Sequence, residues 1–96
     1  MKIHELKCWP EFFAPIHDGT KPFDLRKNDR RFKVGDKLHL REYDDRKNTY
    51  TGREVHRRIT YMLEGVGPGA ITPFHGLARG YCILGLSAMD QSVEIK

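Results

Sequence analysis

The stretch GTKPFDLRKNDRRFK, residues 19–33, combines a strand signal with a high density of charge. Six of its fifteen residues are cationic and two are acidic. Phe23 and Leu25 have the period-two spacing of a β-strand, which places Asp24 and Arg26 on the opposite face. The pattern therefore predicts a strand that buries its apolar pair and presents a polar face.

The region 21–41 around this strand holds most of the positive charge of the protein. Its eight basic and three acidic residues give +5, more than the +4 of the whole chain. A localised cationic patch is typical of proteins that bind a polyanion, most simply nucleic acid. Charge alone leaves open a solvated basic surface without a partner. The residues expected to hold a nucleic-acid backbone lie in the polar loop after the strand: Lys27, Asn28, Arg30, Arg31 and Lys33.

The length of 96 residues predicts one domain, residues 1–96, with a loosely held tail from about residue 88. The longest apolar run, residues 81–86, suits one buried strand and is too short to cross a membrane. The charged N-terminus differs from a signal peptide, so we expect a cytoplasmic protein.

Cysteine and histidine usage indicates neither a metal nor another cofactor. Cys8 and Cys82 form no CxxC pair, and the five histidines lack metal-ligand spacing. Two reduced core thiols are the favoured interpretation, and one disulfide is the alternative.

The remaining elements follow from local patterns. His4, Leu6 and Cys8 share one face of a first strand, and a short helix over residues 10–18 ends at Gly19 as its C-cap. Further strands are expected near residues 37–41, 55–63 and 81–86. The polar residues 44–52 form a connection, and the glycine-rich residues 65–80 form a long irregular segment of the kind that is often functional. In the strand near residues 55–63, the apolar side is marked by Val55, Ile59, Tyr61 and Leu63, and Arg57 interrupts it.

These elements predict a mainly β fold with short helices: a small, closed or nearly closed β-barrel, mostly antiparallel, with the early helix packed on it. The side chains expected to be mostly buried are Phe12, Phe13, Ile16, Phe23, Leu25, Leu38, Leu40, Ile59, Ile83 and Leu86.

The order of LKCWP, a short helix ending in glycine, KPFDLR, FKVGDKLHL and GYCILGL resembles the ASCH domain of the PUA-like superfamily. With RKNDRRF and REYD included, it is most similar to an uncharacterised bacterial and phage branch of that family. The family motif, a glycine, a lysine, an acid and an arginine, matches Gly19, Lys21, Asp24 and Arg26. The resemblance implies a small barrel with a cleft lined by the motif strand and by the loop after the first strand.

The motif makes chemical sense as a ligand-binding cleft. An acid between two cations orients them and tempers their repulsion, so that Lys21 and Arg26 can meet a phosphate or a base edge while Asp24 accepts a hydrogen bond. Trp9 is either a base-stacking platform beside this cleft or a core aromatic. We therefore expect a nucleic-acid-binding module, for RNA rather than DNA or for modified nucleotides. A charge network that merely holds strand to loop is the alternative.

Two other function classes remain open. Some ASCH proteins hydrolyse N4-acetylated cytidine with a lysine, a threonine three positions later and a distant glutamate. Here Lys21 matches the lysine, Asp24 stands at the threonine position, and Glu64 is the candidate for the glutamate role. Because a carboxylate replaces the hydroxyl nucleophile, that mechanism is in doubt, although a carboxylate can serve as a general base and cleavage of RNA stays open. The third class is a protein-interaction module. Oligomeric state cannot be read from the pattern.

Overall fold

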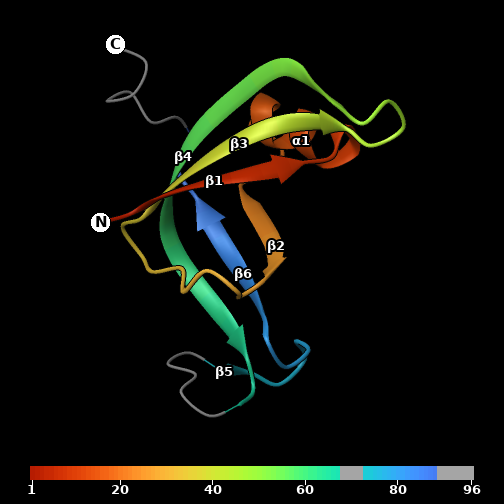
Figure 1. Ribbon diagram of the computed structural model, residues 1–96. Coiled ribbons are helices and arrows are strands. Elements are labelled where there is room, and N and C mark those ends of the chain that lie inside the picture. Colours follow the sequence, from red (N-terminus) through yellow and green to blue (C-terminus); the bar gives the residue numbers. More distant parts are fainter. Residues whose placement is uncertain (68–72, 89–96) are drawn as a thin grey trace.

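A computed structural model describes residues 1–67 and 73–88 of the chain (Figure 1). The expected tail beyond residue 88 and part of the glycine-rich segment lie outside these residues. The described elements, in chain order, are β1 (Ile3–Cys8), α1 (Pro10–Asp18), β2 (Phe23–Lys27), β3 (Lys37–Asp44), β4 (Thr49–Gly65), β5 (Pro73–Phe74) and β6 (Tyr81–Leu86).

The strands form one curved sheet in the order β1-β3-β4-β6-β2, with β5 paired to β4. The β1–β3 and β4–β5 pairs are parallel, and the other pairs are antiparallel. The long strand β4 pairs with β3 along its first part and with β6 along its last part, so it belongs to both halves of the sheet (Figure 1).

The mainly β fold with a short helix is confirmed, but the closed barrel is wrong. The sheet path begins at β1 and ends at β2, and within residues 1–67 and 73–88 no backbone ladder joins these two strands. The expected polar connection over residues 44–52 is also shorter than predicted, because β3 continues to Asp44 and β4 begins at Thr49.

The core lies on the inner face of the sheet under α1. Phe13 and Ile16 of the helix are buried together with Leu38, Leu40 and Ile59, as the sequence predicts. Leu86 is also buried, whereas Ile83 is half-buried and Phe12 is 49% exposed. The prediction for Phe12 is wrong because α1 turns only its Phe13 and Ile16 side inward.

The burial of β2 is the reverse of the prediction. Asp24 is only 4% exposed, whereas Phe23 is 42% and Leu25 is 53% exposed. A period-two pattern identifies two faces but does not say which one meets the interior. The face of β2 that meets the interior is the one that carries Asp24 and Arg26.

A bulge in β4 changes which residues face the core. The register with β6 shifts between Ile59 and Tyr61, and beyond the shift Met62 is buried while Tyr61 is 59% exposed. The expected inward position of Tyr61 is therefore wrong. One extra residue in a strand moves all later side chains to the other face.

The helix ends as the sequence predicts. Gly19 has φ +87°, in the left-handed region that favours glycine, and its N–H donates to the carbonyl of Ile16 at 3.2 Å. Lys21 then donates its N–H to the carbonyl of Pro15 at 3.0 Å, which leads the chain directly into β2.

Arg57 is a buried cation at the C-terminus of α1. Its Nη2 donates to the carbonyls of Ile16 at 3.2 Å and His17 at 3.4 Å, and its Nη1 donates to the carbonyl of His56 at 2.9 Å. A cation is favourable there because the last carbonyls of a helix lack intrahelical donors and carry partial negative charge. Arg57 thus interrupts the apolar side of β4 in order to fix the helix to the sheet.

Asp36 joins the start of β3 to the N-terminal strand. Its carboxylate accepts hydrogen bonds from the N–H of Lys2 at 3.0 Å, the N–H of Lys33 at 3.1 Å and Nε2 of His4 at 2.9 Å. Burial alone would raise the pKa of Asp36, but the hydrogen bonds from His4, Lys2 and Lys33 lower it below its ordinary value. Asp36 therefore stabilises the fold in its ionised form.

Gly65, at the end of β4, is needed because of a close approach between two chain segments. A Cβ atom on this residue would lie 2.0 Å from the carbonyl oxygen of Ala78. Of the predicted segment 65–80, residues 68–72 lie outside the described residues, and Pro73–Phe74 pairs with Glu64 and Gly65 as β5 rather than being irregular.

No helix in residues 1–67 or 73–88 combines the length and apolarity that crossing a membrane requires.

We expect Arg57→Met to destabilise the protein by about 2–4 kcal/mol, because the carbonyls of Ile16 and His17 lose a donor in a buried position. Urea denaturation followed by circular dichroism measures the change. Arg46→Met, at an exposed turn, is the matched control and should stay within about 0.5 kcal/mol of the wild type. Equal stability of the two variants would contradict this role of Arg57.

We expect Asp36→Asn to cost about 1.5–3 kcal/mol at pH 7, because the amide turns an N–H₂ group toward hydrogen-bond donors. The pKa of Asp36 in the folded state lies below its usual 3.8, so its contribution is present above that pH. It is lost as the pH falls through the lower, folded-state pKa. Unfolding free energies measured from pH 7 down to pH 2 should therefore converge for the two proteins at the acid end. A constant gap, or a similar effect of Asp45→Asn at an exposed turn, would argue against it.

Candidate nucleic-acid interface

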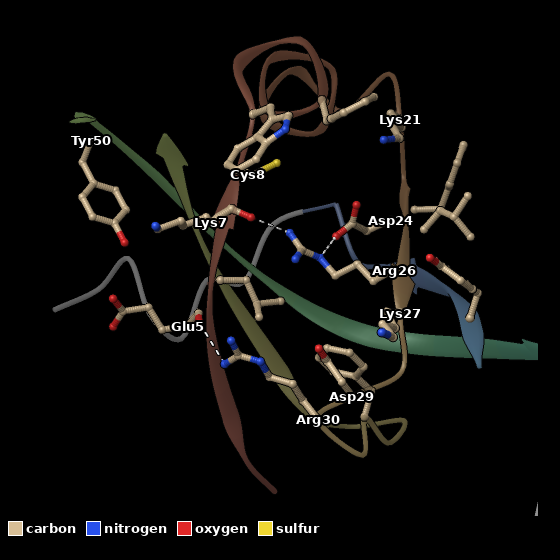
Figure 2. Close-up of a pocket in the computed structure, with 17 residues that line it drawn as sticks. Glu5, Lys7, Cys8, Lys21, Asp24, Arg26, Lys27, Asp29, Arg30 and Tyr50 are labelled. Carbon is tan, nitrogen blue, oxygen red and sulfur yellow. Dashed lines mark hydrogen bonds and ion pairs between the residues drawn. The ribbon is translucent and has the colours of Figure 1, made fainter. Parts of the chain in front are cut away.

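A groove of about 1090 Å³ lies between the two end strands β1 and β2 (Figure 2). It follows the free edge of β2, and residues from both faces of that strand line it together with residues of β1, α1 and the loop after β2. The groove therefore occupies the opening that a closed barrel would seal.

Arg26 crosses this groove from β2 to β1. Its Nε donates to Asp24 Oδ2 at 2.5 Å, and its Nη2 donates to the carbonyl of Lys7 at 2.8 Å (Figure 2). The Asp24 side chain is 6% exposed and that of Arg26 is 22% exposed. A buried carboxylate is tolerable when it is paired and hydrogen-bonded in this way.

Arg30 makes a second crossing from the loop after β2. Its Nη1 donates to the carbonyl of Glu5 at 3.3 Å (Figure 2). Glu5 and Lys7 are two residues apart on an end strand, so their carbonyls point toward the same free edge. Side chains of Arg26 and Arg30 thus bind backbone acceptors that a neighbouring strand would otherwise occupy.

Cations outnumber acids along the groove. The basic residues that line it are Lys7, Lys21, Arg26, Lys27 and Arg30, and the acidic ones are Glu5, Asp24 and Asp29. Because Asp24 is paired with Arg26, the accessible excess is positive. Lys7, Lys21, Lys27 and Arg30 are the cations available to an incoming anion.

Aromatic rings lie beside these cations. The groove is lined by Trp9, Phe12, Phe23, Tyr50 and Tyr81, which are between 37% and 49% exposed, and by the buried Phe32. The ammonium group of Lys21 lies 4.9 Å from the ring centre of Phe12 and 5.4 Å from that of Phe23. One cation therefore sits between two half-exposed rings, a cation–π arrangement.

The structure brings together some of the residues predicted from the sequence. Trp9, Lys21, Asp24 and Arg26 line one groove, and Lys27 and Arg30 extend it.

Other predicted residues do not line the groove. Arg31 and Lys33 are exposed elsewhere on the loop. Asn28 has a local structural contact instead, because its Oδ1 accepts the N–H of Phe32 at 3.4 Å. Trp9 also contacts the ring of Tyr43 at 5.7 Å between centres, so it has a packing role besides its exposed edge.

Glu64, the candidate catalytic glutamate, does not line the groove. It pairs with Cys82 across β4 and β6, and Cys82 pairs with Arg26 across β6 and β2. Two strand spacings separate Glu64 from Arg26, about 10 Å. Lys21 and Asp24 share a site that Glu64 does not join.

The two cysteines are free and buried, as expected for reduced core thiols. Burial raises the pKa of each thiol to about 11. Both therefore remain protonated near neutral pH and are poor nucleophiles, although Cys8 lines the groove.

Sequence reasoning missed part of the groove. Lys7 gives no signal of its own, because it reads as an ordinary exposed residue of β1. The apolar character of Phe12 and Phe23 predicts core positions, and only the three-dimensional arrangement shows that they flank Lys21.

The chain matches, over residues 3–86, the family described as Domain of unknown function (DUF3850). It is also 41% identical over 63 residues to the "Uncharacterized 12.9 kDa protein in GpA 3'region" of Escherichia phage P2. That alignment covers 66% of this chain and 56% of the phage protein. Both matches agree with the expected uncharacterised bacterial and phage group. The chain belongs to the DUF3850 family.

Proposed function

We propose that the groove between β1 and β2 binds single-stranded nucleic acid, RNA in preference to DNA. The observation that carries the proposal is the presence of half-exposed aromatic rings and an excess of cations along one groove. Proteins that bind single strands combine these two features, because bases stack on rings while cations follow the phosphates. The preference for RNA comes from the resemblance to ASCH domains.

The groove offers separate partners for the parts of a nucleotide. Lys7 on β1 and Lys27 and Arg30 on the other side can contact successive phosphates. Phe12 and Phe23 can stack a base next to the ammonium of Lys21. The Asp24 carboxylate holds the Arg26 guanidinium in place, so Arg26 presents a fixed donor to a base edge or phosphate.

We also propose that this family has the PUA-like plan of ASCH domains in a form whose barrel stays open at the groove. The support is the element order and the motif of Gly19, Lys21, Asp24 and Arg26 in and before the strand that follows the first helix. Three of these residues line the groove.

Hydrolysis is the weaker alternative on this geometry. The Asp24 carboxylate is engaged by Arg26, and Glu64 does not line the groove. Neither acid therefore stands ready as a general base beside Lys21. Assays with RNA and N4-acetylcytidine should score product as well as binding, and turnover without added metal would favour the hydrolase.

Stacking predicts that Phe12→Ala weakens binding of a single-stranded RNA about 5- to 150-fold, the loss expected for one stacked base. Fluorescence anisotropy at one salt concentration measures the affinity, with DNA of the same sequence as the comparison. The matched control is Tyr61→Ala, since Tyr61 is an exposed aromatic that does not line the groove. An equal effect of both variants, or none from Phe12→Ala, would contradict stacking in the groove.

Phosphate contacts predict a steep salt dependence. If Lys7, Lys27 and Arg30 each neutralise one phosphate, the plot of log affinity against log salt has a slope of about −2, at roughly −0.7 per contact. Lys27→Ala should reduce the magnitude of this slope by about 0.7. Lys33→Ala removes the same charge from an exposed position outside the groove lining and should leave the slope unchanged. Identical slopes for the two variants would point to diffuse charge attraction.

A further inference from the structure

The half of the sheet formed by β1, β3 and β4 carries, on its outer face, a group of polar side chains that is separate from the groove. This group, here called the His39 cluster, consists of His39, Glu54 and His56. Each residue offers one possible metal-ligand atom, and these atoms lie within 4.8 Å of one another. His39 and His56 are direct cross-strand partners, with ring centres 4.3 Å apart and planes 13° from parallel. Glu54 precedes His56 by two residues and so shares its face of the strand.

We propose that the His39 cluster binds a zinc ion. Nε2 of His39 is hydrogen-bonded to Oε1 of Glu54, and a zinc ion can take the place of the proton that these two atoms share. A ring nitrogen of His56 supplies the third bond. Ligand atoms of a tetrahedral zinc ion lie about 3.4 Å apart for bonds of about 2.1 Å, so modest side-chain rotations close the site. The fourth position is left for water.

The second nitrogen of His39 gives independent support. Nδ1 of His39 lies 3.9 Å from Oε1 of Glu5, which is its neighbour on β1. Metal-bound histidines commonly donate their other N–H to a carboxylate, which fixes the ring and its tautomer. With Glu5 on the Nδ1 side, Nε2 is the nitrogen that turns toward the metal.

Arg41 is arranged so that it does not block the site. Its Nη1 donates to Oε2 of Glu5 at 3.0 Å, and its Nε lies 3.9 Å from Oε2 of Glu54. The ring nitrogens of His39 instead face the Oε1 atom of each of these two acids. The guanidinium thus hydrogen-bonds one oxygen of Glu5, and its Nε lies on the side of the Glu54 oxygen that His39 does not contact.

Lys7 and Arg58, two cations of the same face, each have a partner outside the His39 cluster. Nζ of Lys7 lies 4.2 Å from the ring centre of Tyr43, and Nη1 of Arg58 donates to the carbonyl of Gly35 at 3.2 Å.

The donor set selects the class of metal. Two imidazoles and one carboxylate suit zinc and its transition-metal neighbours, whereas magnesium and calcium prefer ligands that are all oxygen. His39, Glu54 and His56 do not line the groove between β1 and β2, so the zinc site stands or falls independently of nucleic-acid binding.

Isothermal titration of the EDTA-treated, dialysed protein with zinc chloride tests the site. We expect one equivalent of Zn²⁺ to bind, and Mg²⁺ at the same concentration not to bind. His39→Gln and His56→Gln should each weaken binding at least tenfold, since even loss of an outer partner costs about 10- to 100-fold. His75→Gln, an exposed histidine outside the cluster, is the matched control and should change the affinity less than twofold.

Glu54→Gln and circular dichroism keep the test decisive if a histidine variant folds poorly. The folded Glu54→Gln protein should also lose at least tenfold in zinc affinity. Absence of zinc binding by the wild type would overturn the proposal. So would equal affinities for the wild type and the folded cluster variants, because zinc would then be held adventitiously elsewhere.

Discussion

The two contacts of Arg26, with Asp24 on β2 and with Lys7 on β1, determine how the open side of the sheet is built. Its guanidinium holds the buried Asp24 carboxylate of β2 and the Lys7 carbonyl of β1 at the same time. Without this cation, Asp24 would be a buried and unpaired charge, which proteins do not tolerate. With it, β2 can turn its polar face inward. Because the polar face of β2 points inward, Phe23 and Leu25 on its other face lie at the surface, where they line the groove.

The same arginine side chains also explain why the sheet does not need to close. An end strand with free carbonyls is a template for pairing with another chain. Here Arg26 and Arg30 bind the carbonyls of Lys7 and Glu5 by side chains. Hydrogen bonds hold both ends of the loop that carries Arg30. At one end the N–H of Asn28 donates to the carbonyl of Gly80, and at the other the N–H of Lys33 donates to the carboxylate of Asp36. The edge of β1 is thus protected, while the space beside it stays accessible.

Local patterns predict the elements of this fold better than their mutual arrangement. The faces of β1, the limits of α1 and its C-cap at Gly19 follow from nearest-neighbour chemistry, and the structure confirms them. The faces of β2 do not follow, because alternation is symmetric until an ion pair such as Asp24–Arg26 decides which side is interior. The bulge after Ile59 has no local signal in the sequence either, and for this reason the predicted inward position of Tyr61 is wrong.

The candidate sites show the same limit. Lys21, Asp24 and Arg26 are close in sequence, so their common location could be predicted. The pairing of His39 with His56 depends on the register between β3 and β4 over a separation that no short motif spans. A search for metal-ligand spacing therefore passes over the His39 cluster, although each of its residues is plainly visible in the sequence.

Glu5 of strand β1 takes part in both surfaces. The backbone carbonyl of Glu5 accepts a hydrogen bond from Arg30 at the groove, and its carboxylate faces His39 and Arg41 on the outer side. Such a division is possible because a strand directs its carbonyls along the sheet and its side chains out of it. An edge strand can therefore contribute its main chain to one surface and its side chains to another. The short β1 strand thus takes part in both the open groove and the polar cluster.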